Sequence, residues 1–304
     1  MSTDSDANVR FGVFLPQLRM SFDTVLERTL AAEAAGFDSV WLMDHLAAPA
    51  APEWDTLEGW TLAAGLATRT NRIRLGHLVT CDPFRHPAVL AKMAATLDVI
   101  SSGRLELGLG WGSVDEELRT FGIDAGPAAE RAARLRETLE ILPRMFAGEP
   151  FDYTGRHYRL EGARGRPLPV QSRIPVHVGG AGPKLTMPLV RDFADWWNCP
   201  SYAADRLEEL RPLAGNTRVS VQRPVGLAIA AKDRDEVDEV VTRRFGSWGG
   251  VVAGTPAEVA AALAADVELG ARGFVLQFHD FGTPATFECF MREVAPAVRA
   301  AVSR

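Results

Sequence analysis

Short apolar runs alternate with longer amphipathic, alanine-rich segments along most of the chain. The apolar runs have the length and composition of buried strands, whereas the longer segments repeat apolar residues at helical spacing. The expected strands lie at 9–15, 39–43, 72–80, 104–109, 175–178, 194–198, 219–230 and 273–278. The expected helices lie at 21–35, 56–68, 87–100, 115–146, 183–192, 204–213, from 234 onward, 256–269 and 284–302. Eight strand–helix units over roughly 300 residues predict a single α/β domain spanning 1–304, a (β/α)8 TIM barrel with insertions.

Local signals support several of these boundaries. Ser21 is a suitable N-cap for the first helix, Gly36 is placed to stop it, and Pro87 suits a first helical turn. Residues 151–160 contain a Thr-Gly pair between β-forming residues and predict a hairpin, while residues 161–174 are expected to be irregular. A doubly wound sheet is the alternative fold, but the first strand is not followed by the GxGxxG of a dinucleotide site.

Composition and charge narrow the function classes. The chain has 304 residues, 47% of them hydrophobic, and a net charge of -6, which argues against a nucleic-acid-binding surface. The start is polar and acidic rather than signal-like, and no apolar run is long enough to cross a membrane. Three widely spaced cysteines, without CxxC pairing, suggest reduced thiols. We therefore expect a cytoplasmic protein that does not act at a membrane.

Candidate chemistry lies at the expected strand ends, where barrels carry their sites. Asp44 and His45 follow the second strand, and such a pair can orient an imidazole for proton transfer near neutral pH. The alternative is an aspartate that caps a turn beside a solvated histidine. The other histidines form neither HxH nor HExxH, and no GxSxG occurs, so neither a metal-dependent hydrolase nor a nucleophile elbow is indicated.

Glycines gather at two further strand ends. The run GLGWGS (residues 108–113) leaves room for a planar ring against the backbone, or else reflects tight packing in the barrel. The run VGGAGPK (residues 178–184) precedes a helix, where backbone N–H groups and Lys184 favour an anion such as a phosphate. A tight strand-to-helix turn is the alternative, and the run is not a Walker loop.

Taken in order, these segments resemble the luciferase-like monooxygenase superfamily, and within it the F420-dependent oxidoreductases of actinobacterial type. The resemblance rests on FGVFLPQ (11–17), AEAAGFDSVWLMDH (32–45), the segment 73–112, VGGAGPK and FADWWN. It implies coenzyme F420, or alternatively FMN, across the barrel mouth. Gly179, Gly180, Gly182 and Pro183 would then hold the phosphate, with Asp44 and His45 beside the reactive ring edge. Leu78 and Val79 fall where the family often has a non-prolyl cis peptide, and Thr80, Trp111 and Gly112 would complete the ring contacts.

One departure concerns the chemistry. Sugar-phosphate dehydrogenases of this family carry a catalytic glutamate in a GTGE-like motif, where this chain has Ser113 in GWGS. The nearby acids 115–117 are expected to start the next helix, where they favour its dipole. The glutamate-dependent reaction and a sugar-phosphate substrate are therefore both in doubt.

The resulting hypothesis is hydride transfer between F420 and an organic substrate, with His45 as proton donor or acceptor tuned by Asp44. The alternatives are an FMN-dependent two-component monooxygenase and a cofactor-binding barrel without turnover. Basic residues at the rim, such as Lys184 and Arg85, favour the anionic tail of F420. The pocket is expected from loops such as 47–54 and 161–172. Four tryptophans suggest an apolar or aromatic small molecule as substrate: Trp41, Trp54, Trp111 and Trp197. The family resemblance also allows a homodimer.

Overall fold

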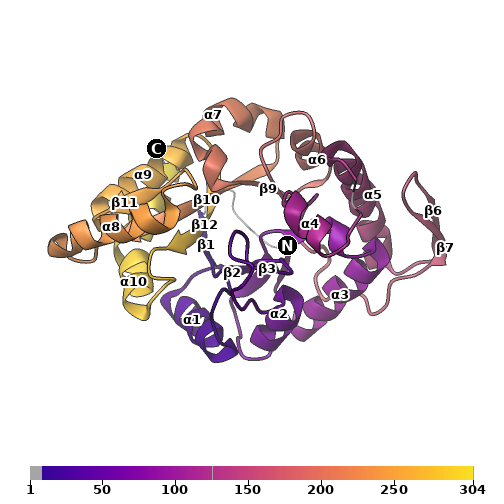
Figure 1. Cartoon of the computed structure of the whole chain (residues 1–304), viewed down its shortest axis with the longest axis horizontal. Coiled ribbons are helices and arrows are strands. Elements are labelled where there is room, and N and C mark those ends of the chain that lie inside the picture. The colour runs from indigo at the N-terminus through magenta and orange to yellow at the C-terminus, as the bar shows by residue number, and fades with distance from the viewer. Residues whose placement is uncertain (1–8, 125, 304) are drawn as a thin grey trace.

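Eight parallel strands close into a barrel in the computed structural model, which describes residues 9–124 and 126–303 (Figure 1). The order around the barrel is β1, β2, β3, β5, β8, β9, β10 and β12, and β12 pairs with β1. Pairing of β9 with β10, with Trp196 opposite Arg218, completes the ring. The strands are β1 (Arg10–Phe14), β2 (Ser39–Leu42), β3 (Arg74–His77), β5 (Leu105–Gly110), β8 (Val176–Gly179), β9 (Trp196–Cys199), β10 (Arg218–Leu227) and β12 (Ala271–Phe278). The predicted TIM barrel is confirmed.

Helices surround the barrel, as the alternating pattern predicted (Figure 1). The Ser21 hydroxyl accepts a hydrogen bond from the Thr24 N–H at 3.1 Å, and Gly36 ends the first helix with a φ of 96°. Pro87 occupies the first turn of the third helix. The helices are α1 (Phe22–Ala35), α2 (Gly59–Ala67), α3 (Pro87–Ile100), α4 (Asp115–Thr120), α5 (Ala128–Ala147), α6 (Thr186–Phe193), α7 (Leu207–Leu210), α8 (Arg234–Phe245), α9 (Pro256–Glu268), α10 (Pro284–Cys289) and α11 (Ala295–Ala300).

Several predicted elements differ from the structure. The continuous helix expected at 115–146 is two helices, α4 and α5, because Gly122 and Gly126 both adopt a positive φ of 69° between them. The helix expected at 204–213 is mostly 3-10 turns around the short α7, and a π turn separates α10 from α11. The third strand ends at His77, and two short strands, β4 (Thr80–Cys81) and β11 (Val252–Gly254), were not predicted.

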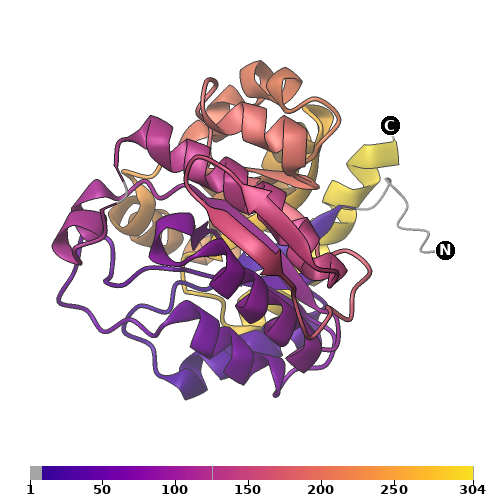
Figure 2. The same ribbon diagram turned by 90° about the vertical axis from the view of Figure 1, so that its right-hand side faces the viewer.

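The predicted hairpin forms outside the barrel and leaves the strand ends open. It consists of the antiparallel strands β6 (Phe151–Thr154) and β7 (Arg159–Ala163) (Figure 2). Glu137 of α5 fixes the turn, because its carboxylate accepts hydrogen bonds from three successive backbone N–H groups of residues 156–158. The segment after it, residues 164–167, lines a small cavity with α3 and α5 on the side of the barrel.

The interior of the barrel is filled rather than hollow. The buried carboxylate of Glu106 accepts from Arg10 at 2.7 Å and from Arg74 at 2.5 Å, and it also contacts His177. The His177 ring stacks on Trp196 at 5.7 Å. Burial alone would raise the pKa of Glu106, but the neighbouring cationic groups hold it well below the ordinary value. Arg10 and Arg74 are the first residues of their strands, so this cluster fills the barrel near the amino ends of the strands.

Candidate active site

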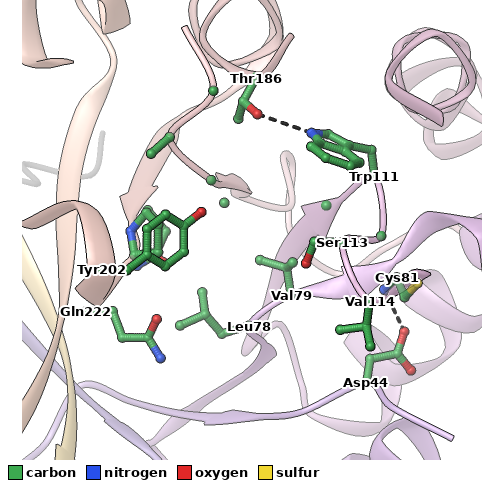
Figure 3. A pocket seen from close by; sticks show the side chains of 18 of the residues that line it. Asp44, Leu78, Val79, Cys81, Trp111, Ser113, Val114, Thr186, Tyr202 and Gln222 are labelled. Atoms are coloured by element: carbon green, nitrogen blue, oxygen red, sulfur yellow. Dashed lines mark hydrogen bonds between the residues drawn. The ribbon is translucent and has the colours of Figure 1, made fainter. Parts of the chain in front are cut away.

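A cavity of about 530 Å³ opens at the carboxyl ends of the strands, the face where TIM barrels carry their sites (Figure 3). Segments from six barrel strands contribute to its wall. The lining residues are Asp44, His45, Leu78, Val79, Cys81, Gly110, Trp111, Gly112, Ser113, Val114, Glu117, Leu118, Gly179, Gly180, Ala181, Gly182, Pro183, Thr186, Asn198, Pro200, Tyr202, Arg206 and Gln222.

One wall of the cavity is the Leu78–Val79 peptide, which is cis, as the family resemblance led us to expect. The Val79 side chain sits between two glycines of neighbouring strands. A Cβ on Gly110 would lie 2.5 Å from one Val79 methyl carbon, and a Cβ on Gly179 would lie 2.8 Å from the other. Only glycine at both positions lets Val79 occupy this place, so the strand-end glycines serve the wall of the cavity.

The glycine turn (residues 179–183) forms a second wall and leads into α6. Gly180 has a φ of 125°, a conformation that L side chains rarely adopt. Within the described part of the chain, the backbone N–H groups of Ala181 and Gly182 have no hydrogen-bond acceptor. Trp111 closes the turn from the opposite side by donating its indole N–H to the Thr186 hydroxyl at 3.1 Å (Figure 3). The turn before α6 therefore offers two neighbouring backbone N–H groups without an acceptor, and such groups in a turn can bind an anion.

Asp44 is buried at the end of β2 and forms an ion pair with Arg85. The guanidinium donates to both carboxylate oxygens, at 2.6 and 2.8 Å, and the Cys81 N–H donates to one of them at 2.8 Å. This bidentate geometry is the strong form of an Arg–carboxylate pair. The pKa of Arg85, although burial lowers it, is raised above its ordinary value by Asp44. Asp44 thus ties the β2 end to β4 rather than presenting a free carboxylate.

His45 pairs with Glu117 of α4 across the cavity mouth. Glu117 Oε2 lies 2.8 Å from His45 Nδ1, and Glu117 Oε1 accepts from the backbone N–H groups of Leu46 at 2.6 Å and Ala47 at 3.2 Å. Burial would raise the pKa of Glu117, but these hydrogen bonds hold it below the ordinary value. Because a carboxylate only accepts, Nδ1 of His45 carries a proton. In neutral His45, Nε2 is then a bare acceptor.

The structure brings most of the predicted site residues together. Ten of them line the cavity: Asp44, His45, Leu78, Val79, Trp111, Gly112, Gly179, Gly180, Gly182 and Pro183. Thr80 does not; it is fully buried in β4, so its contact with a cofactor stays a prediction. The roles of the ten lining residues toward a cofactor also remain predictions.

Four details differ from what the sequence suggested. His45 pairs with Glu117, whereas Asp44, its expected partner, is taken by Arg85. Arg85 is therefore the partner of Asp44, with a side chain only 13% exposed, and not a free rim cation. Segments 47–54 and 161–172 contribute no lining residue to this cavity. Trp111 lines it, but Trp41, Trp54 and Trp197 do not: the first and third are buried and Trp54 is exposed.

Sequence reasoning missed Glu117, although a signal for it exists. The acids 115–117 do open α4, as expected. Glu117, however, shares a helical face with Val114 and Leu118, three positions before it and one after it, and both apolar residues line the cavity. An acid on the inward face of a helix needs a partner, and His45 supplies it. Asn198, the last residue of the FADWWN segment, and Gln222, which no motif marked, also line the cavity.

Other chemistries find less support in the described residues. Cys81 lines the cavity, but burial raises the pKa of its thiol, so it is no activated nucleophile. No group of three or more His, Cys, Asp or Glu side chains in the described part of the chain is arranged to hold a metal ion. None of the described helices is long and apolar enough to span a membrane.

The closed eight-stranded barrel, with a cavity over the carboxyl ends of its strands, places the protein in the TIM-barrel class. Residues 9–249 match the luciferase-like monooxygenase family, and the chain belongs to it.

Among curated relatives, an F420-dependent glucose-6-phosphate dehydrogenase of Microbacterium testaceum is 32% identical over 244 residues, covering 77% of this chain and 67% of that protein. An F420-dependent hydroxymycolic acid dehydrogenase of Mycobacterium tuberculosis is 28% identical over 232 residues, covering 76% and 63%. The chain thus spans about two thirds of the length of these relatives.

Solved structures share the fold along nearly the whole chain. An F420-dependent secondary alcohol dehydrogenase in complex with an F420-acetone adduct superposes with a TM-score of 0.81 at 19% identity, covering 96% of this chain and 99% of that one. The oxygenating constituent of 3,6-diketocamphane monooxygenase from Pseudomonas putida, in complex with FMN, gives 0.76 at 20% identity, covering 95% and 98%. At these identities the likeness establishes the fold.

Proposed function

We propose that the protein is an F420-dependent oxidoreductase that transfers a hydride between the deazaflavin and an organic substrate. The observation that carries the proposal is that the glycine turn and the His45–Glu117 pair face one cavity at the strand ends. The F420-dependent relatives support F420 as the cofactor. Their named substrates are not carried over, because Ser113 stands where the family motif has glutamate.

The cavity residues fit such a cofactor. Gly179, Gly180, Gly182 and Pro183 would surround its phosphate, with the unpaired N–H groups of Ala181 and Gly182 as donors, and a side chain at Gly180 would be strained. The cis Leu78–Val79 wall would lie against the ring system, opposite Trp111 and Gly112 of the β5 end; all four residues line the cavity. When bound, F420 supplies a ring carbon that accepts or delivers a hydride.

The proton that accompanies a hydride falls to His45. Glu117 holds Nδ1–H of its ring, so Nε2 is the atom available to accept a proton from a substrate hydroxyl or return it to a carbonyl oxygen. The His45 side chain is 26% exposed and lines the cavity, which leaves it accessible to a substrate. Glu117 is a positioning residue here, because it acts through His45 and fixes its tautomer.

The proposal predicts anaerobic turnover that depends on His45. Protein loaded with F420 is mixed, without oxygen, with a panel of alcohols, and the visible absorbance of F420 is followed. His45→Ala should lower turnover at least about 100-fold, the usual contribution of a general base, while F420 affinity changes little. Unchanged turnover in His45→Ala removes the residue from this role, and turnover only with FMN and oxygen refutes the proposed function.

A second readout isolates the role of Glu117 and needs no substrate. Nitrogen NMR of the histidine rings should show the Nδ1–H tautomer for neutral His45 in the wild-type protein and a mixture of tautomers in Glu117→Ala. The matched control is Glu116→Ala, because Glu116 is an exposed acid on the same helix. A His45 tautomer that is identical in both variants contradicts the assignment of Glu117 as its positioning residue.

A further inference from the structure

The charged side chains of the cavity are all engaged with other parts of the protein. Asp44 is paired with Arg85, and Glu117 accepts from His45 and from two backbone N–H groups. Arg206, at the exposed rim, donates to both carboxylate oxygens of Glu209 at 2.9 and 2.8 Å. Among the described residues that line the cavity, therefore, no lysine occurs and no arginine lacks an acidic partner.

Much of the remaining lining of the cavity is uncharged. Leu118 and Pro200 provide apolar surface. Leu78 and Val114 add to it, and the Gln222 side chain supplies a neutral amide from β10 (Figure 3). Apart from the paired charged groups, the lining thus combines one imidazole and a few neutral polar groups with apolar side chains. Such a surface suits a molecule with apolar flanks and a single polar reacting group.

Among the described residues that line the cavity, a substrate phosphate or carboxylate would meet no cationic side chain that is free of an acidic partner. Proteins bind such groups with Arg or Lys forks or with clustered backbone N–H groups, because a desolvated anion without a partner is costly. The glycine turn provides the N–H groups, but the proposed function assigns it to the phosphate of the cofactor. The Glu117 carboxylate beside His45 would also repel a second anion placed near the reacting atom.

We infer that the substrate is an uncharged alcohol, or in the reverse direction an uncharged ketone or aldehyde, with apolar flanks. The inference rests on the proposed function. In the oxidative direction the carbinol carbon loses its hydrogen with two electrons, as hydride, to oxidised F420. The hydroxyl oxygen loses its proton to His45 Nε2, and the C–O single bond becomes a carbonyl. Reduction by the reduced deazaflavin reverses both transfers, so atoms and electrons balance in each direction.

The test compares neutral alcohols with a phosphorylated sugar on the F420-loaded protein. A fluorescence titration with F420 first establishes loading, so failure of the proposed function is seen separately at that step. Cyclohexanol, 2-butanol and glucose 6-phosphate are then offered under anaerobic conditions. In parallel, isothermal titration calorimetry measures binding of glucose 6-phosphate and of inorganic phosphate to the loaded protein, which gives a readout independent of activity.

We expect turnover with at least one neutral alcohol, at a kcat/KM at least about 100-fold above that for glucose 6-phosphate, and no saturable binding of either phosphate compound. Saturable binding of glucose 6-phosphate that Arg206→Gln abolishes would overturn the inference and place a substrate anion at the rim. Preferred turnover of glucose 6-phosphate overturns it as well. Turnover of neither class by protein that has bound F420 also refutes the assignment, because the inference states that an uncharged carbinol suffices.

Discussion

Gly179→Ala should destabilise the protein and weaken F420 binding through one contact, that with Val79. The alanine Cβ would lie 2.8 Å from a Val79 methyl carbon, whereas ordinary contacts begin at 3.4 Å, so Val79 must shift by at least 3.4 − 2.8 = 0.6 Å. Gly110 lies against the other methyl and limits movement to that side. The remaining direction leads into the cavity, where Val79 already forms part of the wall.

Overpacking of this kind costs about 1–3 kcal/mol of unfolding free energy. We expect that loss in urea denaturation, together with roughly tenfold weaker F420 binding, because the wall moves into the space of the cofactor. Gly182, three residues after the strand end, serves as an internal comparison: a Cβ there would meet nothing closer than 3.3 Å, so Gly182→Ala should cost less stability.

A double-mutant cycle that combines Gly179→Ala with Val79→Ala tests whether the contact with Val79 is the cause. If the clash with Val79 is the cause, Gly179→Ala should lose most of its effect on stability when Val79 is already alanine. The coupling free energy of this double-mutant cycle should then be at least about 1 kcal/mol. Additive effects, with a coupling below about 0.3 kcal/mol, would refute the contact argument and point to the backbone of the turn instead.

Two further predictions concern buried carboxylates. Burial raises the pKa of Asp82 from 3.8 to about 6, so the folded state disfavours its charged form, and stability is lost as the pH rises through about 6. The unfolding free energy of Asp82→Asn should therefore equal that of the wild type near pH 4 and exceed it by up to about 3 kcal/mol at pH 8. This figure corresponds to about two pKa units at about 1.4 kcal/mol each. A difference between the two proteins that does not change with pH would contradict the prediction. Asp44→Asn leaves the partly buried Arg85 without its bidentate partner and should cost about 3 kcal/mol in urea denaturation, most of which the double variant with Arg85→Met recovers. Equal losses in the single and double variants would show that the pair is not the cause.

The barrel was predictable because its determinants are local. Alternation of buried strands with amphipathic helices, and caps such as Ser21 and Gly36, set most elements within a few residues. The errors arise where local pattern competes with backbone geometry. Gly122 and Gly126 interrupt what otherwise reads as one amphipathic helix, and β11 has only three residues, too few for a periodicity to show.

The location of the site was also predictable, but its pairings were not. Strand ends are marked in the sequence by Asp44–His45 and by the glycine runs, and the barrel brings them to one face. The partners are set by tertiary contact: Glu117 lies 72 positions from His45, and Arg85 lies 41 positions from Asp44. Adjacent residues in sequence suggested an Asp44–His45 pair, whereas in the fold Asp44 pairs with Arg85 and His45 with Glu117.

The most direct test of the central claim is a fluorescence titration of the purified protein with F420 and, separately, with FMN. We predict F420 binding in the micromolar range or tighter, with FMN at least about tenfold weaker, corresponding to about 1.4 kcal/mol. Tighter binding of FMN would contradict the account and favour a two-component monooxygenase, and binding of neither compound would contradict the assignment of the cavity as a deazaflavin site.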